Sequence, residues 1–270
     1  MSRLFYLLLL IICWLASCHP AVGGSTPKSQ RETVTSLLRT LLRSVKVDDF
    51  NPNPNVHIAL RLARDHNLAT EELLLKQLKE ASVRKVLNGE DFSSGLVALY
   101  TLAVASSCND PANVMANGKT INLIGILEEK VTQEMKHIEA TGFPLSNYYQ
   151  VSLDVLTLCV MNRHVSPCSV RILTRAVDEE KFTHGSEFSV DTGSVAALAL
   201  RCVKQAGTIQ NTVNVGDALT KVLTQILEHV KDDGLIGNLY STGEAMQVTQ
   251  ADTLTQTEGR ASHHPRHSGF

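Results

Sequence analysis

Polar side chains that could bind a ligand occur just before three apolar helical segments of the chain. They are Ser146, Tyr149 and Gln150 in SNYYQ, Asp191 in SVDTG, and Asn238 and Ser241 in GNLYSTG. Hydroxyl, phenol and amide groups donate and accept hydrogen bonds, and a carboxylate accepts them, so these groups can bind a ligand without a covalent step. We expect these groups to suit a large, mostly apolar ligand that is edged with amides.

Each of these residues also has a simpler interpretation as a helix cap. Side chains of Asp, Ser and Asn before a helix accept hydrogen bonds from its free backbone N–H groups. Ser241 with Glu244 three residues later fits a capping box, and Asp191 taken alone fits a cap slightly better than a ligand group. The recurrence of polar helix starts, rather than any single residue, favours a binding site.

Patterns typical of enzymes and metal sites are weak. Asp154 and Asp191 could form a glycosidase-type carboxylate pair, but Asp154 falls in the middle of an apolar helical segment. The sequence contains no GxSxG, CxxC or HExxH motif, and no cysteine has a histidine context typical of a nucleophile. We therefore expect neither catalytic residues nor metal ligands, with a helical glycosidase-like enzyme as the less favoured alternative.

Helical periodicity runs through nearly the whole chain, without convincing strand alternation. Small-residue segments such as YYQVSLDVLTLC and DTGSVAALALRC alternate with more charged amphipathic segments over 119–138, 169–180 and 211–231. A repeat of roughly 45 residues of this kind predicts stacked helical hairpins, with the small-residue helices as an inner layer. The fold class is therefore all-α, an (α/α) toroid, and the polar helix starts converge at one of its ends.

The first 24 residues have the pattern of a secretory signal peptide. Arg3 precedes an apolar run over residues 4–16, and small residues follow it. The run is shorter than the ~20 residues that a membrane span needs, and we expect no membrane insertion. An alternative is a lipoprotein box over residues 15–18, which would lipidate Cys18.

Charge and composition narrow the class of partner. The net charge of -2 argues against electrostatic capture of nucleic acid or an anionic membrane. After the signal peptide (1–24) we expect a helical domain over 25–248 and a disordered polar tail over 249–270, secreted to an extracellular location. Four cysteines remain in that chain, and two bridges among them allow three pairings: Cys108, Cys159, Cys168 and Cys202.

Five segments resemble the secreted cobalamin (vitamin B12) carriers, the family of intrinsic factor, haptocorrin and transcobalamin. They occur in the family's order within residues 30–248 and read NPNPNVHIALRLA, GLVALYTLAVASSCNDP, NYYQVSLDVLTLC, FSVDTGSVAALALRC and DDGLIGNLYSTGEAMQ. The resemblance implies an N-terminal (α/α)6 barrel joined to a smaller β domain, with cobalamin between the two. It also implies a non-catalytic carrier for cobalamin transport, with a cell-surface uptake receptor as a further partner.

The resemblance assigns residues to the ligand and to one disulfide. Positions that contact the ligand in the family match Ser146, Tyr149, Gln150, Asp191 and Asn238, with Ser241 nearby. A family disulfide matches Cys159 and Cys202. Cys108 matches a cysteine whose family partner lies beyond this chain's end, which leaves Cys108 either free or paired with Cys168.

Departures from the family pattern modify these expectations. Leu96 replaces a family glutamine that contacts the ligand, and Phe188 stands where transcobalamin can supply a histidine to cobalt. We therefore expect no axial histidine ligand. The family's later helices and β domain do not follow Val248, which is the pattern of an incomplete barrel from a short paralogue, a splice product or an incomplete gene model. A non-binding fragment or decoy is the alternative function.

Overall fold

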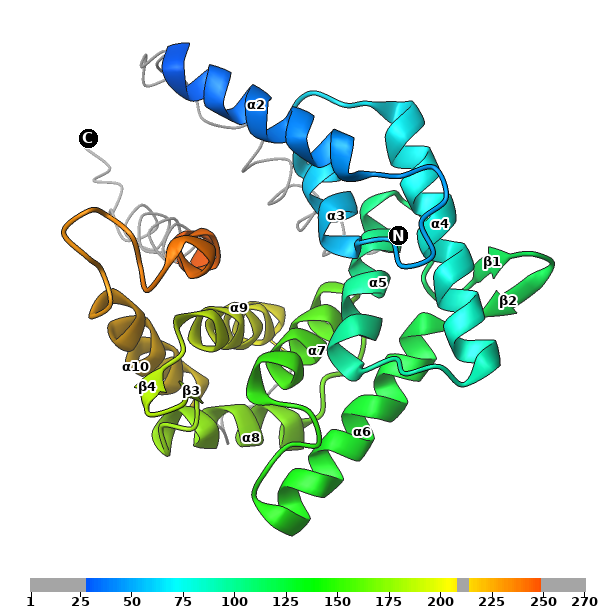
Figure 1. The fold of residues 1–270 in the computed structure, drawn as a ribbon. Coiled ribbons are helices and arrows are strands. Elements are labelled where there is room, and N and C mark those ends of the chain that lie inside the picture. The colour runs from blue at the N-terminus through cyan, green and yellow to red at the C-terminus, as the bar shows by residue number, and fades with distance from the viewer. Residues whose placement is uncertain (1–27, 208–213, 249–270) are drawn as a thin grey trace, which may run out of the picture.

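A computed structural model describes residues 28–207 and 214–248. The predicted signal peptide over 1–24 and the predicted polar tail over 249–270 lie outside these residues. The described helices follow one another along an arc, with α2 at one end and the helical residues 239–248 at the other (Figure 1). The helices are α2 (Lys28–Ser44), α3 (Pro54–Leu62), α4 (Leu68–Asn88), α5 (Ser94–Ser106), α6 (Leu123–Thr141), α7 (Tyr148–Val160), α8 (Pro167–Asp178), α9 (Val190–Ala206) and α10 (Val215–Leu227).

The helices form two layers, as the hairpin repeat predicts. Helices α5, α7 and α9 pack side by side in the inner layer, and α6, α8 and α10 lie outside them (Figure 1). Small residues on α9 permit this close packing: Ala196, Ala197 and Ala199 are each 0% exposed. The seam between α7 and α9 is the centre of the core. Removal of its apolar surface from water stabilises the fold.

Two short β-hairpins interrupt the helices, and the sequence-based expectation of no strands is wrong in these places. Strands β1 (Val114–Ala116) and β2 (Lys119–Ile121) pair antiparallel, as do β3 (Thr183–His184) and β4 (Glu187–Phe188). The first hairpin turns at Asn117 and Gly118, both with positive φ, as a two-residue Asn-Gly turn requires. The predicted helix over 119–138 therefore begins later, at Leu123.

One disulfide joins the two central inner helices. Cys159 of α7 and Cys202 of α9 are bonded, with their Cα atoms 6.2 Å apart, which confirms the pairing implied by the family resemblance. Cys108 and Cys168 are both free thiols in the part of the chain that the structure describes. The Cys168 thiol instead donates a hydrogen bond to Glu139 Oε1 at 3.0 Å.

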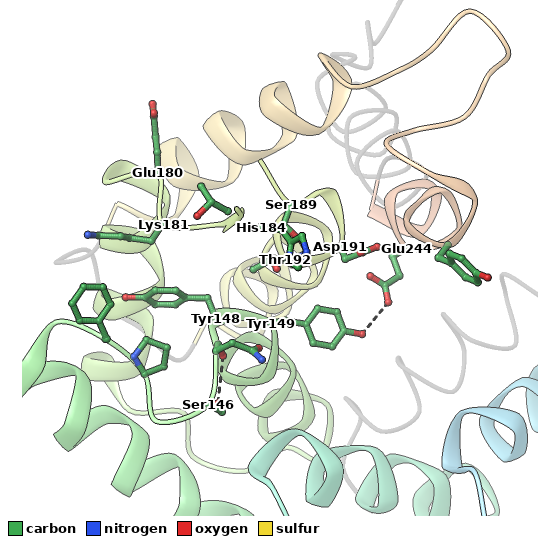
Figure 2. Close-up of a pocket in the computed structure, with 15 residues that line it drawn as sticks. Ser146, Tyr148, Tyr149, Glu180, Lys181, His184, Ser189, Asp191, Thr192 and Glu244 are labelled. Atoms are coloured by element: carbon green, nitrogen blue, oxygen red, sulfur yellow. Dashed lines mark hydrogen bonds between the residues drawn. The ribbon is translucent and has the colours of Figure 1, made fainter. Parts of the chain in front are cut away.

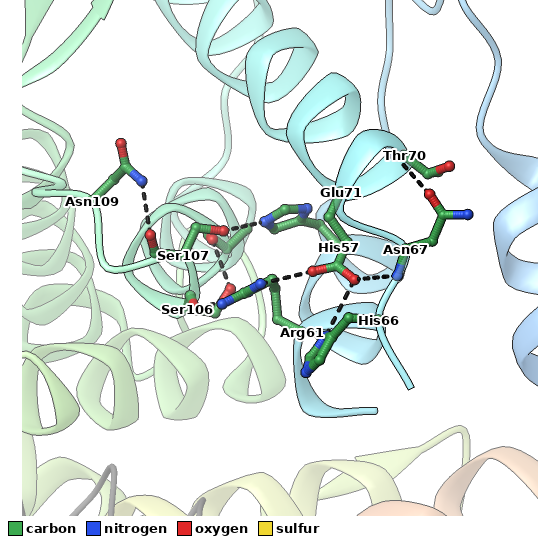
Figure 3. A network of polar contacts seen from close by, with 10 residues as sticks. His57, Arg61, His66, Asn67, Thr70, Glu71, Ser106, Ser107 and Asn109 are labelled. Atoms are coloured by element: carbon green, nitrogen blue, oxygen red, sulfur yellow. Dashed lines mark hydrogen bonds and ion pairs between the residues drawn. The ribbon is translucent and has the colours of Figure 1, made fainter. Parts of the chain in front are cut away.

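A buried polar network ties α3 and α4 to the end of α5 (Figure 3). Arg61 Nη1 lies 2.7 Å from Glu71 Oε2, and Arg61 Nε donates to the Ser106 carbonyl at 3.2 Å. Burial opposes ionisation of Glu71, but hydrogen bonds from Arg61, Asn67 and His66 lower its pKa. Glu71 is thus a paired, buried anion that fixes the start of α4 against α3.

His57 lies beside this network and is 0% exposed. Its Nε2 is 2.7 Å from the Ser107 hydroxyl, which joins α3 to the end of α5. Burial, together with the nearby Arg61 charge, lowers the pKa of His57 to about 4. The imidazole is therefore neutral at physiological pH.

Among the residues that the structure describes, no helix is both long enough and apolar enough to cross a membrane.

Candidate functional site

A cavity of about 800 Å³ lies where α7, α9 and the helix over 239–248 begin (Figure 2). Hydrogen-bonding side chains from all three helices line it, as expected if the polar helix starts share one end of the toroid. The side chains in its wall include Ser146, Tyr149, Asp191, Tyr240 and Glu244.

A second cavity of about 740 Å³ adjoins the first. The two share Ser189, Asp191 and His184 in their walls, so Asp191 lies between them. Asn238 and Ser241 line only this second cavity. The two cavities together therefore bring five of the six residues expected to bind ligand into one region, and Gln150 is the one that lines neither.

Glu134 of α6 positions the loop that carries Ser146. This carboxylate is 3% exposed and accepts hydrogen bonds from the backbone N–H groups of Leu145 at 2.8 Å and Ser146 at 3.0 Å. Asn147 then caps α7 by accepting from the Gln150 N–H at 2.9 Å. The sequence contains no local signal for the role of Glu134, because it lies eleven or more residues before the groups that it binds.

Tyr149 forms a hydrogen bond across the cavity wall. Its hydroxyl donates to Glu244 Oε1 at 3.0 Å, so that α7 is linked to the helix over 239–248 (Figure 2). Burial and the neighbouring Glu244 carboxyl raise the pKa of Tyr149. Burial, with a contribution from the Asp191 charge, raises the pKa of Glu244 to about 7.

Asp191 is not the cap of α9, so the cap interpretation of this residue is wrong. Ser189 is the N-cap: its hydroxyl oxygen accepts from the Thr192 N–H at 3.3 Å. Asp191 falls in the first turn of α9, half-buried in the cavity wall. The free N–H groups of that turn favour a negative charge at this position of the cavity wall.

Gln150 connects two inner helices. Its Oε1 accepts a hydrogen bond from the Gly95 N–H at 3.1 Å, which holds the start of α7 against the start of α5. A Cβ atom at position 95 would lie 2.7 Å from Gln150 Cγ, so a larger residue there would displace the Gln150 side chain. The Gln150 carbonyl is thus already occupied, and its NH₂ group is the part left for other contacts.

Asn238 and Ser241 form a capping box in which Asn238 is the N-cap and Ser241 is the third residue of the helix. Asn238 is the cap, and its Oδ1 accepts from the N–H groups of Tyr240 at 2.7 Å and Ser241 at 3.0 Å. Ser241 Oγ accepts from the Asn238 N–H at 2.8 Å and donates to the Ile236 carbonyl at 2.6 Å. The predicted box with Ser241 as cap is therefore wrong, since the helix begins two residues before Ser241 and Glu244 bonds to Tyr149 instead.

Asp154 does not pair with Asp191 across either cavity. It is 1% exposed, in the middle of α7, and is absent from the residues that line the two cavities. Burial raises its pKa to about 8. Within residues 28–207 and 214–248, no group of three or more His, Cys, Asp or Glu side chains could hold a metal ion.

Comparison with known proteins gives a consistent set of relatives. The family described as eukaryotic cobalamin-binding protein matches residues 4–264. Human transcobalamin-1 is 36% identical over 223 residues, which cover 78% of this chain and 50% of that protein. Cobalamin binding intrinsic factor from Rattus norvegicus is 34% identical over 234 residues, which cover 83% of this chain and 49% of that protein.

A solved structure has the same fold. The crystal structure of haptocorrin in complex with Cbi superposes with a TM-score of 0.65 at 31% sequence identity. The match covers 83% of this chain and 56% of that chain. The chain thus spans about half the length of the curated relatives it matches.

Proposed function

Because the chain belongs to the eukaryotic cobalamin-binding protein family, we propose that it is a secreted carrier that binds cobalamin non-covalently for transport and uptake. The observation that carries this proposal is the cavity of about 800 Å³ at the starts of α7 and α9, with hydrogen-bonding groups in its wall. We propose a cell-surface uptake receptor as the further partner, and no catalytic role.

The chemistry of the cavity wall suits the amide side chains of a corrin. Asp191 is a carboxylate that accepts hydrogen bonds from amide N–H groups. The Tyr149 hydroxyl donates a hydrogen bond to Glu244, so its oxygen is left to accept a hydrogen bond from the ligand. The Ser146 hydroxyl makes a long hydrogen bond of 3.4 Å to the Asn147 carbonyl, and it can turn to donate to an amide carbonyl of the ligand instead.

The other three proposed ligand residues act at the edge of the site. Gln150 and Asn238 each use their side-chain oxygen inside the protein, which leaves an NH₂ donor for the ligand. Ser241 is 1% exposed with its hydroxyl bonded twice, and we assign it to holding the loop that presents Asn238. No imidazole from position 188 is involved, since Phe188 occupies it.

Equilibrium dialysis with labelled cyanocobalamin tests this function. Asp191→Asn keeps the shape of the side chain and removes its charge, and hydrogen bonds to charged groups contribute about 1.5–3 kcal/mol. We therefore expect its Kd to rise roughly 10- to 100-fold while circular dichroism shows unchanged helix. Asp65→Asn, at an exposed position between α3 and α4, is the matched control and should bind like the unmodified chain.

Two results would contradict the proposal in different ways. A folded chain that binds no cyanocobalamin at high micromolar ligand would favour the non-binding fragment. Unchanged binding by Asp191→Asn would show that Asp191 is not a ligand contact. Secretion is tested separately, by the N-terminal sequence of the chain recovered from culture medium, which we expect to begin after the 1–24 leader.

A further inference from the structure

Glu244 is a half-buried residue in the cavity wall, and neither helix capping nor the expected ligand contacts account for its carboxyl group. Its Oε1 accepts the Tyr149 hydroxyl at 3.0 Å. Its Oε2 is buried and has no hydrogen-bond partner among the residues that the structure describes. A carboxylate oxygen in that position would carry uncompensated negative charge, whereas a protonated one would not.

Asp191 increases the advantage of the protonated form. It lies in the same cavity wall, and its negative charge opposes a second charge on Glu244 (Figure 2). When two carboxyls share a site, the pair favours one proton between them, and the more buried group holds it. The Oε2 of Glu244 is buried without a hydrogen-bond partner among the described residues, so the proton belongs to Glu244.

We propose that Glu244 is a proton-carrying positioning residue of the ligand site. As the neutral acid it accepts the Tyr149 hydroxyl without placing a second negative charge beside Asp191. This inference rests on the proposed function, because it concerns how the cobalamin site is kept in its binding form.

Ligand binding and protonation of Glu244 are therefore linked. A bound corrin removes water from the wall, and desolvation disfavours the ionised carboxyl still further. The free protein, in which the pKa of Glu244 is about 7, must then take up a proton to bind at higher pH. The Kd should rise above pH 7, by at most about tenfold per pH unit.

Other titratable groups line the cavity as well. They are Tyr148, Tyr149, Glu180, Lys181, His184, Asp191 and Tyr240. Glu180 and Lys181 point away from Glu244 (Figure 2), and the Glu180 side chain is 70% exposed. Of these groups, Asp191 from α9 raises the pKa of Glu244 and the hydrogen bond from Tyr149 of α7 lowers it, so that burial, the largest influence, decides the direction.

The test is the Kd of cyanocobalamin for the full chain between pH 5.5 and pH 9. The unmodified chain should bind equally at pH 5.5 and 6.5 and lose about tenfold in affinity or more between pH 7 and 9. Glu244→Gln, which imitates the neutral acid, should bind well with a flat profile. Glu72→Gln, exposed on α4, is the control and should keep the pH dependence.

Calorimetry of the unmodified chain provides a second measurement that does not depend on a variant. At pH 8, binding enthalpies in two buffers of different ionisation enthalpy should reveal uptake of a substantial fraction of one proton. A Kd that is constant from pH 7 to 9, or a Glu244→Gln profile that matches the unmodified one, would overturn this inference alone. Absence of binding by both chains at every pH would overturn the proposed function and this inference together.

Discussion

Asp154 is a carboxyl that the fold holds in its neutral form at a cost in stability. It lies in the middle of α7 and is 1% exposed. Neither of its oxygens has a hydrogen-bond partner within the described part of the chain. The Ser94 hydroxyl is close enough to favour the ionised form but does not reach hydrogen-bond geometry, so burial still raises the pKa to about 8.

The cost follows from the difference between the folded and unfolded pKa. The ordinary value is 3.8, so the unfolded chain ionises Asp154 at a pH where the folded chain does not. Below about pH 4 both states hold the proton, and burial of the neutral Asp154 carries no ionisation cost. As the pH rises from 4 through 8, the unfolded chain releases the proton first, and the free energy of unfolding falls. At about 1.4 kcal/mol per unit, the loss is roughly 2 kcal/mol at pH 5 and roughly 4 kcal/mol at pH 7.

Asp154→Asn keeps the size of the side chain and cannot ionise. Relative to the unmodified chain, we expect its free energy of unfolding to rise by about 1.4 kcal/mol for each pH unit between 5 and 8. Urea unfolding followed by circular dichroism measures this difference, and Glu244, which also has a raised pKa, cancels because it is present in both chains. Asp65→Asn at an exposed site is the control and should give a difference that does not vary with pH.

A constant difference between Asp154→Asn and the unmodified chain from pH 5 to 8 would refute this reasoning. It would mean that Asp154 ionises normally, and hence that water or a cation reaches the centre of α7.

Two further predictions concern His57 and Glu134. The folded pKa of His57, about 4, is below its ordinary 6.5, so its stabilising contribution is present above pH 6.5 and about 3 kcal/mol is lost as the pH falls to 4. His57→Gln should be less stable than the unmodified chain at pH 7, because glutamine packs less well in this buried position. Urea unfolding should show that this difference shrinks by about 3 kcal/mol at pH 4, since glutamine does not take up a proton. A difference that does not vary with pH would contradict this prediction. Glu134→Gln leaves one of two loop N–H groups without its acceptor, which costs about 1–3 kcal/mol, and it should weaken cyanocobalamin binding in dialysis roughly tenfold. Glu129→Gln, exposed on the same helix, should bind normally, and equal binding by both variants would show that the loop does not need Glu134.

Hydrophobic periodicity was sufficient to predict the helical hairpins and their layers. The segments became α5, α7 and α9, and the small side chains on α9 let α7 pack closely against it. The Asn117-Gly118 turn is a local sequence signal for the first strand pair, which helical periodicity does not contain. The proposed domain limits at residues 24 and 248 stay predictions.

The identity of each helix cap was not decided by residue type. Ser189 and Asp191, like Asn238 and Ser241, are all good capping residues, and the cap is whichever one the backbone places just outside the first helical turn. If the start of a helix moved by two or three residues, the capping side chain and the side chain in the cavity wall would exchange places. Local sequence contains too little information to choose, because tertiary packing sets where each helix begins.

The fold class and the kinds of polar group at the helix starts follow from the amino-acid sequence, and the inner-layer disulfide follows from the family resemblance. The pairing of those polar groups depends on the packed structure. Tyr149 and Glu244 are 95 residues apart, and Glu134 supports a loop from a different helix. Such pairs depend on distances between elements, and so do the burial and the charges that set the pKa of Glu244 and Asp154. These quantities exist only once the chain is packed.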